Sequence, residues 1–273
     1  MKKHKRKRWL WLLVVPLLAV AGFVGWATII PAPQAEALAA LRASPAVDVQ
    51  QGTWLVFQPH DRTPRVGLVL YPGGRVDARA YAPLAHALAS EGFLVVIVPM
   101  PLNLAVLGQD RAQTVFAAFP GIQKWAIGGH SLGGAMAAQF AWSHPEAVAG
   151  LVLWAAYPAD GANLAQRELA VVSVSGSLDG LATAETMVAK QGLLPAATRY
   201  VVIQGGNHAQ FGWYGPQSGD NPATISHAAQ QAQVVEATRM LLQQLQTIGI
   251  SEPVRPALNA LEQHRFVYPM LIP

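Results

Sequence analysis

A short glycine-rich motif near the middle of the chain, Gly129-His130-Ser131-Leu132-Gly133, holds a serine at a position suited to nucleophilic chemistry. In a Gly-x-Ser-x-Gly pentapeptide the serine lies on a strained strand-to-helix turn, which exposes its hydroxyl oxygen. Glycines two residues to either side permit the tight turn and a close approach of the backbone. The preceding KWAI is typical of a strand and the following LGGAMAAQFAW of a helix. This context predicts Ser131 as a nucleophile.

The same glycines also fit a flexible turn or a phosphate-binding loop. A phosphate-binding loop ends in Lys-Ser or Lys-Thr, which supplies a charged contact to the phosphate. Neither dipeptide follows these glycines, so this interpretation is disfavoured, whereas a plain structural turn stays open. His130 is the variable position of the motif, and we expect it to be structural.

A serine hydroxyl needs a neighbouring base, and the histidines that follow Ser131 are the candidates. His208 follows a strand-like run, RYVVIQ, in the glycine-containing loop GGNHAQFG. His144 and His227 are better interpreted as helix-end or solvated residues, and His264 lies in the C-terminal segment. The pattern favours His208 as the base, with an ordinary loop histidine as the alternative.

The base in turn needs a carboxylate that orients its ring, and two aspartates are candidates. Asp179 follows the strand-like AVVSV in the loop SGSLDG, and Asp160 follows the preceding strand in AAYPADG. The chain order of serine, acid and histidine favours Asp179. Either residue also fits an ordinary turn aspartate beside a glycine.

Two backbone N–H groups are expected to stabilise the oxyanion of an attacked carbonyl. The N–H of Leu132, directly after the nucleophile, is the first of them. The second is expected from the loop YPGGR, with Gly74 favoured and Arg75 as the alternative.

The surrounding sequence alternates between short apolar runs and helical patterns. We expect helices at about 78–90, 109–118, 135–142, 181–190 and 222–246, and strands at about 53–57, 66–71, 93–98, 124–127, 150–154, 170–174 and 199–203. Strands separated by helical segments indicate βαβ units, so we predict an α/β fold with a mostly parallel central sheet flanked by helices.

The N-terminal part of the chain predicts attachment to a membrane. Six of the 19 Lys and Arg residues lie within residues 1–8, and an uncharged run of 22 residues follows over 9–30. A helix of that length crosses the apolar core of a bilayer. The basic flank is expected in the cytoplasm and the following domain outside, at the cell membrane. The alternative is a signal peptide that is cleaved within residues 32–43, which would give a secreted protein.

The rest of the chain is then divided by composition. Residues 31–46 are expected to form a linker, residues 47–250 the catalytic domain, and residues 251–273 a tail packed on that domain. Without residues 1–8 the chain carries 13 basic and 15 acidic side chains, so we expect no nucleic-acid partner. The chain has no cysteine, which excludes disulfides and thiol nucleophiles.

These motifs together resemble the α/β-hydrolase superfamily, in particular the α/β-hydrolase fold-5 family and dienelactone-hydrolase-like proteins. The likeness rests on YPGGRVDARAYAPLAHALASEGFLVVIVPMP, GGHSLGGAMAA, SGSLDGL and GGNHAQFG, which follow one another in the family's order. The dienelactone-hydrolase-like proteins use a cysteine nucleophile, where this chain has Ser131. The resemblance implies a Ser131–Asp179–His208 triad and no cofactor. No metal site is expected, because the His and Asp residues lack ligand spacing such as H-E-x-x-H.

The resulting hypothesis is a membrane-anchored serine hydrolase that cleaves carboxylic ester or thioester bonds of small molecules or lipids. The alternatives are a hydrolase of peptides or acyl lipids at the membrane surface and a non-catalytic binding domain on a hydrolase scaffold. We expect the loops at residues 75–79, 99–109 and 211–220 to roof a partly apolar site.

Overall fold

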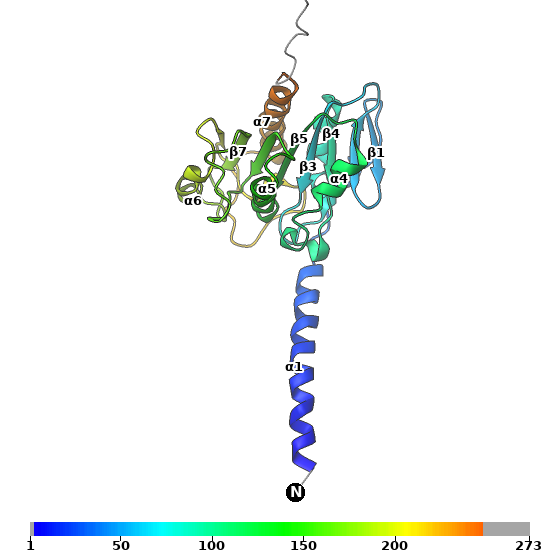
Figure 1. Cartoon of the computed structure of the whole chain (residues 1–273), viewed down its shortest axis with the longest axis vertical. Helices are drawn as coiled ribbons and strands as arrows, with labels where there is room; N and C mark the ends of the chain where they lie inside the picture. Colours follow the sequence, from blue (N-terminus) through cyan, green and yellow to red (C-terminus); the bar gives the residue numbers. More distant parts are fainter. Residues whose placement is uncertain (1–2, 248–273) are drawn as a thin grey trace, which may run out of the picture.

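A computed structural model describes residues 3–247 as a twisted eight-stranded sheet with helices on both faces (Figure 1). The order across the sheet is β1-β2-β4-β3-β5-β6-β7-β8. The strand bounds are β1 Val47–Gln51, β2 Leu55–Pro59, β3 Val66–Tyr71, β4 Leu94–Ile97, β5 Lys124–His130, β6 Gly150–Trp154, β7 Ala170–Gly176 and β8 Arg199–Ile203.

In the order of the sheet, all neighbouring strands from β4 through β3 to β8 pair in parallel. Strand β2 pairs antiparallel with both β1 and β4. This confirms the predicted α/β fold with a mostly parallel sheet. Every residue of β3, β4 and β6 is buried, as expected of strands that are covered on both faces. Strand β1 was not predicted, because its polar sequence VDVQQ lies at the sheet edge and only Val47 is fully buried.

Two helical layers cover the sheet and create two apolar clusters. Helices α3 (Ala82–Ser90) and α7 (His227–Thr247) pack on one face, and α5 (Leu132–Ser143) packs on the other with α4 (Ala112–Ala118). The short helix α6 (Ala184–Ala189) lies between β7 and β8 in the chain. Pro83 occupies the first turn of α3, where its missing N–H costs no hydrogen bond.

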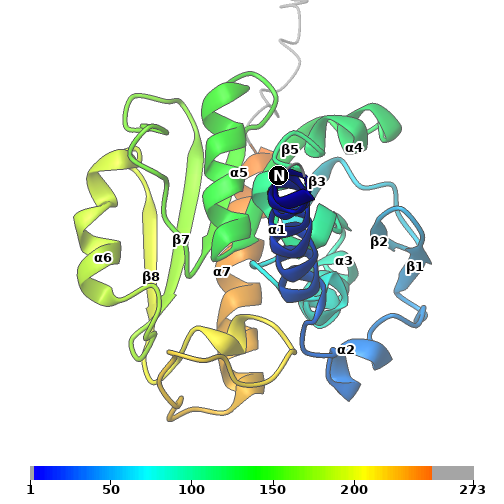
Figure 2. The same ribbon diagram turned by 90° about the horizontal axis from the view of Figure 1, so that it is seen from below.

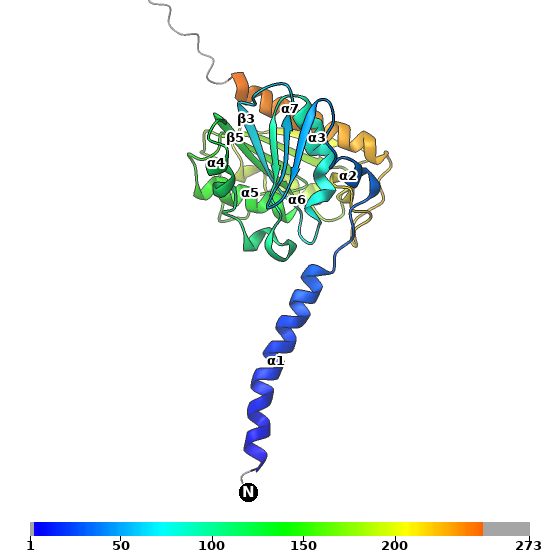
Figure 3. The same ribbon diagram turned by 90° about the vertical axis from the view of Figure 1, so that its right-hand side faces the viewer.

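Helix α1 (Lys3–Thr28) projects away from the domain (Figures 1 and 3). It leaves the domain at the end opposite to the C-terminal end of α7. Over Trp11–Thr28 its mean hydropathy is 2.0, and its side chains are almost all exposed. Among the described residues this helix alone is long and apolar enough to cross a membrane. Its backbone includes residues 3–8, which belong to the predicted basic tail.

The predicted linker at residues 31–46 is attached to the domain rather than free. It contains the short helix α2 (Ala35–Ala39), whose Ala37 is buried, and Leu41 joins the apolar cluster beneath α3. The backbone N–H of Gln34 donates to the carbonyl oxygen of Trp213 at 2.9 Å. The predicted packing of residues 251–273 lies outside the described residues.

The start of α7 holds a histidine whose environment disfavours its charged form. His227 stacks on the Trp213 indole, with ring centroids 3.7 Å apart and planes 9° apart. Burial lowers the pKa of His227 to about 4, and the carboxylate of Glu36 opposes this shift only in part. An unfolded histidine has a pKa of about 6.5, so between these values the unfolded chain binds more protons.

We therefore expect acidification from about pH 6.5 to about pH 4 to destabilise the fold through His227. The variant H227Q cannot take up this proton, so its free energy of unfolding should fall less steeply over the same interval. Urea denaturation of the detergent-solubilised protein at several pH values measures both slopes. Equal slopes for H227Q and the wild type would contradict this assignment.

Candidate active site

The three residues predicted to act together all follow carboxyl ends of parallel strands. Ser131 comes directly after β5, Asp179 follows β7, and His208 follows β8. Because these strands run in the same direction, the loops after them lie at one edge of the sheet. Ligand sites of open α/β sheets form at this edge.

The backbone at Ser131 is strained. Its φ of 52° and ψ of −123° lie in a region that side-chain-bearing residues seldom adopt. The turn is fixed on one side by the Ser131 N–H, which donates to the carbonyl oxygen of Trp154 at 2.9 Å. On the other side α5 begins at Leu132. Ser131 stays half-buried at this turn.

The two motif glycines explain how the chain can make this turn. A β-carbon at Gly129 would lie 2.6 Å from the carbonyl oxygen of Tyr71. A β-carbon at Gly133 would collide with the carbonyl oxygens of Tyr71 and Pro72. Both glycines are therefore required by the packing of the turn against the end of β3, which is the physical origin of the Gly-x-Ser-x-Gly spacing.

Asp179 and His208 form a buried, hydrogen-bonded pair. The Nδ1 atom of His208 lies 2.9 Å from Oδ2 and 3.1 Å from Oδ1 of Asp179. Since a carboxylate only accepts, Nδ1 carries the proton that is donated, and Nε2 of the neutral ring is left as the acceptor. Nε2 is buried and has no hydrogen-bond partner in the described part of the chain.

Backbone groups hold the Asp179 carboxylate in place. Its Oδ1 accepts hydrogen bonds from the N–H groups of Leu181 at 2.8 Å and Ala182 at 2.7 Å. The alternative acid, Asp160, lies on the surface and forms an ion pair with Lys190. The structure thus joins His208 to Asp179 and leaves Asp160 apart.

The other histidines named from the sequence lie elsewhere. His144 follows the last turn of α5 and bonds to the Gln113 side chain at 2.9 Å. His227 packs on Trp213, and His264 is outside the described residues. Of the histidines after Ser131 that the structure describes, His208 is therefore the one joined to a buried carboxylate.

His130 connects the serine turn to the His208 loop. Its ring centroid lies 4.5 Å from that of His208, and its ring stacks on Phe211. The hydroxyl of Tyr81 bonds to Nδ1 of His130 at 2.8 Å and accepts the N–H of Gly73 at 3.0 Å. Burial holds the pKa of His130 well below its usual value, and the neighbouring His208 adds to this effect. His130 is therefore neutral at physiological pH and acts as a packing element.

Asp220 links the two loops that carry Asp179 and His208. Its Oδ1 accepts the N–H of Gly180 at 3.0 Å, and its Oδ2 accepts the N–H of Ala209 at 2.8 Å. These donors directly follow Asp179 and His208 in the chain. Asp220 was not predicted, because an aspartate in a Gly- and Pro-containing loop has no distinguishing pattern. The role of Tyr81, which lies within the helix predicted at about 78–90, was not predicted either.

The residues that carry the two predicted oxyanion donors are neighbours. A β-carbon at Gly74 would lie 3.1 Å from Cδ2 of Leu132, so the two residues are neighbours. Among the described residues neither the N–H of Leu132 nor that of Gly74 has a protein acceptor. The alternative donor, Arg75, is engaged, since its N–H donates to the carbonyl oxygen of Asn103 at 2.8 Å.

A cavity of about 430 Å³ opens beside these two residues. As predicted, residues from the loops at 75–79, 99–109 and 211–220 line it. Two further wall residues, Trp26 at the end of α1 and Pro31, were not predicted. The full lining is Trp26, Pro31, Gly74, Arg75, Val76, Leu104, Leu132, Tyr214, Pro216, Gln217 and Ser218. In the described part of the chain no group of three or more His, Asp or Glu side chains is placed to hold a metal ion.

Several solved structures share this architecture. The esterase Est2 from the Planctomycetes species Thermogutta terrifontis superposes with a TM-score of 0.56 at 14% identity, over 82% of this chain and 99% of that chain. A predicted CIB-like hydrolase from Thermoplasma acidophilum gives 0.54 at 15% identity, over 71% and 99%. Est1E from Butyrivibrio proteoclasticus gives 0.56 at 11% identity, over 73% and 96%. At these identities the likeness is one of fold.

None of the curated proteins compared with the chain matches it. A family model described as the alpha/beta hydrolase family, in contrast, matches residues 67–232, which is more than half of the chain. The matched segment runs from β3 into α7 and includes the serine turn and the loops that carry Asp179 and His208. The fold class and the resemblance predicted from the sequence are thereby confirmed. The chain belongs to the alpha/beta hydrolase family.

Proposed function

We propose that the protein is a serine hydrolase that cleaves carboxylic ester or thioester bonds, with Ser131 as nucleophile, His208 as base and Asp179 as orienting acid. The observation that carries this proposal is the buried Asp179–His208 pair, which leaves Nε2 of His208 without a protein partner. This ring packs on His130, the residue before the strained Ser131. A serine nucleophile is activated by a neighbouring base that a carboxylate orients, and Ser131, His208 and Asp179 supply these three groups.

The reaction follows from these roles. Nε2 of His208 takes the hydroxyl proton of Ser131 while Oγ bonds to the substrate carbonyl carbon. The carbonyl oxygen becomes an oxyanion that accepts hydrogen bonds from the N–H groups of Leu132 and Gly74. His208 then gives its proton to the departing alcohol or thiol, which leaves an acyl ester on Ser131. Water, deprotonated by His208, attacks this ester and releases the carboxylic acid and the free serine.

The structural neighbours agree with an ester as substrate. Est2 of Thermogutta terrifontis was solved with propionate and with butyrate, and Est1E with ferulic acid. Each bound molecule is a carboxylic acid, the class of product that ester cleavage yields. By analogy of fold, which is a weaker argument than the geometry of the site, we assign carboxylic esters to this chain.

We further propose that α1 is a retained membrane anchor, with residues 1–8 in the cytoplasm and the domain outside. The basic flank before the apolar run supports this orientation. Retention is supported by contacts at the end of α1: the Arg75 side chain donates to the carbonyl oxygens of Trp26 and Ile29. Cleavage within residues 32–43 would remove all of these contacts.

Replacing the nucleophile tests the mechanism. We expect S131A to lower kcat on p-nitrophenyl butyrate by more than about 10³-fold and to abolish fluorophosphonate labelling, because the attacking oxygen is gone. The control S143A removes an exposed hydroxyl at the far end of the same helix and should keep full activity. Thermal unfolding checks that both variants are folded. If S131A is still labelled by the fluorophosphonate and still turns over the ester, Ser131 is not the nucleophile.

A pair of aspartate variants tests the choice of acid. We expect D179N to lower kcat by about 10²- to 10⁴-fold, because an amide facing Nδ1 no longer stabilises the protonated ring. D160N, which alters only a surface ion pair, should stay within about twofold of the wild type. Steady-state kinetics on a soluble ester separates the two. The reverse ranking would make Asp160 the acid.

The bridge made by Asp220 predicts a positioning effect. Asn at this position keeps one acceptor oxygen, but its NH₂ group cannot accept the second backbone N–H. The loops after Asp179 and His208 then lose one of their shared contacts. We expect D220N to lower kcat roughly 10- to 100-fold with little change in KM. A change in KM alone, with kcat unchanged, would show that Asp220 does not position the Asp179–His208 pair.

A further inference from the structure

The membrane-proximal end of α1 is fixed to the loop that follows β3. Nε and Nη2 of Arg75 donate to the carbonyl oxygens of Trp26 and Ile29, each at 2.9 Å, and the guanidinium lies 4.5 Å above the Trp26 ring. Nδ2 of Asn103 donates to the carbonyl oxygen of Ala27 at 3.1 Å. The last carbonyl groups of a helix have no partners within the helix, so these side chains cap α1.

The two capping residues also belong to the rim of the active site. The N–H of Arg75 donates to the carbonyl oxygen of Asn103, and both residues have a positive φ, 56° and 55°. Arg75 directly follows Gly74, one of the two free N–H donors. The end of α1 and the oxyanion loop are therefore held as a single unit.

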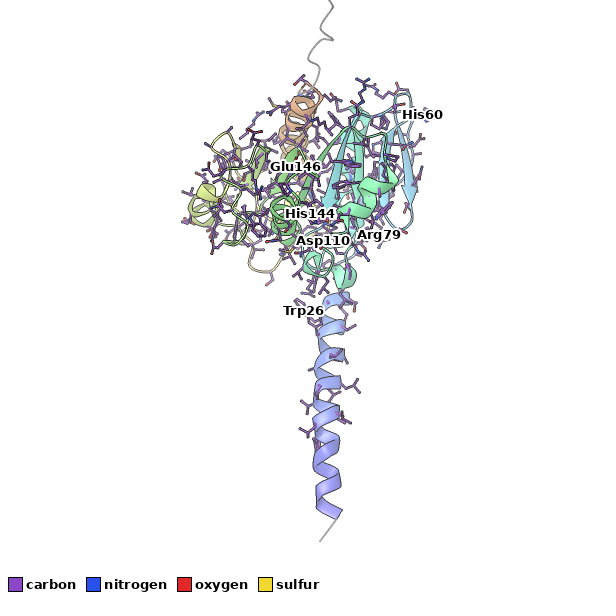
Figure 4. All side chains as sticks on the ribbon, in the orientation of Figure 1. Trp26, His60, Arg79, Asp110, His144 and Glu146 are labelled. Carbon is purple, nitrogen blue, oxygen red and sulfur yellow. The ribbon has the colours of Figure 1, made fainter. Side chains whose placement is uncertain are left out.

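If α1 spans a bilayer, this connection puts the cavity near the membrane surface. The cavity wall includes Trp26 and Pro31 from the anchor side, and Gly74 and Leu132 from the catalytic side. Figure 4 shows Trp26 where α1 meets the domain. Tryptophan side chains favour the membrane–water interface. With α1 in a bilayer, one cavity thus extends from the interface to Leu132, the residue after Ser131.

The lining of this cavity suits an acyl chain. It is mostly apolar, and within the described chain Arg75 is the one charged residue that lines it. The Nε and Nη2 donors of that residue are already occupied by the α1 carbonyl groups.

An exposed apolar patch lies next to the anchor. It consists of Val106 and Leu107, which are 53% and 49% exposed in the 3₁₀ turn Ala105–Leu107. This turn contacts the turn Pro101–Asn103, which itself contacts α1. Figure 2 shows the domain from the side on which α1 projects. A bilayer around α1 that reached this turn would bury both side chains in an apolar phase.

We propose that the substrate is a fatty-acyl ester that resides in the membrane and reaches the site directly from the bilayer. This inference rests on the proposed hydrolase function. The acyl chain passes Val106 and Leu107 and lies along the apolar wall between Trp26 and Leu132. Its carbonyl oxygen then lies at the N–H groups of Leu132 and Gly74.

The test uses the full-length protein reconstituted into dioleoylphosphatidylcholine vesicles that contain monooleoylglycerol. The variant V106Q/L107Q replaces the patch, and both of its residues lie outside the catalytic machinery. The matched control V188Q/V202Q replaces two side chains that are 63% and 53% exposed, on α6 and β8. Each protein is assayed on monooleoylglycerol in the vesicles and on water-soluble p-nitrophenyl butyrate. Flotation verifies vesicle binding, and thermal unfolding verifies folding.

We expect V106Q/L107Q to hydrolyse monooleoylglycerol about tenfold more slowly, because polar side chains obstruct passage from the apolar phase. Its rate on p-nitrophenyl butyrate should stay within about twofold of the wild type, and the control should match the wild type on both substrates. An unchanged rate on monooleoylglycerol, or an equal loss on both substrates, overturns the inference.

The activity of the wild type on the two substrates distinguishes a failure of this inference from a failure of the proposed hydrolase function. If it hydrolyses p-nitrophenyl butyrate but not monooleoylglycerol, access from the bilayer is wrong and the hydrolase function stands. If it hydrolyses neither substrate, the hydrolase function fails and this inference fails with it.

Discussion

The close packing of two backbone segments underlies the whole site. The serine turn lies directly against the end of β3, where only glycine fits at positions 129 and 133. This contact forces Ser131 into a strained conformation, at a free-energy cost of order 1–3 kcal/mol. The cost is tolerated because β5 lies in the middle of a sheet whose neighbouring strands are buried. It also brings Leu132 next to Gly74, so the turn at Ser131 and the loop after β3 depend on each other.

Around this turn the polar groups are held by a buried network rather than by isolated contacts. Asp179 bonds to the His208 ring and to two backbone N–H groups, and Asp220 ties the following residues together. On the other side, Tyr81 joins His130 to the N–H of Gly73. A network of this kind rigidifies a site when its members are satisfied. The Nε2 atoms of His130 and His208 are left without a partner among the described residues, and His208 is the one of these two rings that a carboxylate orients.

The sequence predicted the sheet and the three candidate side chains because both depend on local patterns. Apolar runs such as VGLVLY mark buried strands, and the glycine spacing around Ser131 reflects direct backbone contacts. Strand β1 escaped prediction because an edge strand needs no apolar pattern. Tyr81 and Asp220 escaped because their roles arise from contacts between segments far apart in the chain. The place of Trp26 in the cavity wall was not predicted, because it depends on how Arg75 caps α1.

The wall that α1 shares with the cavity has a consequence for how the enzyme can be handled. Deleting residues 1–30 is the usual way to make such a domain water-soluble. Here that truncation would take away the Trp26 side of the binding cavity and leave the Arg75 guanidinium without its carbonyl acceptors. The shortened domain would then be a different catalyst, with a wider and wetter binding cleft, and its substrate preferences would describe the truncation rather than the native protein.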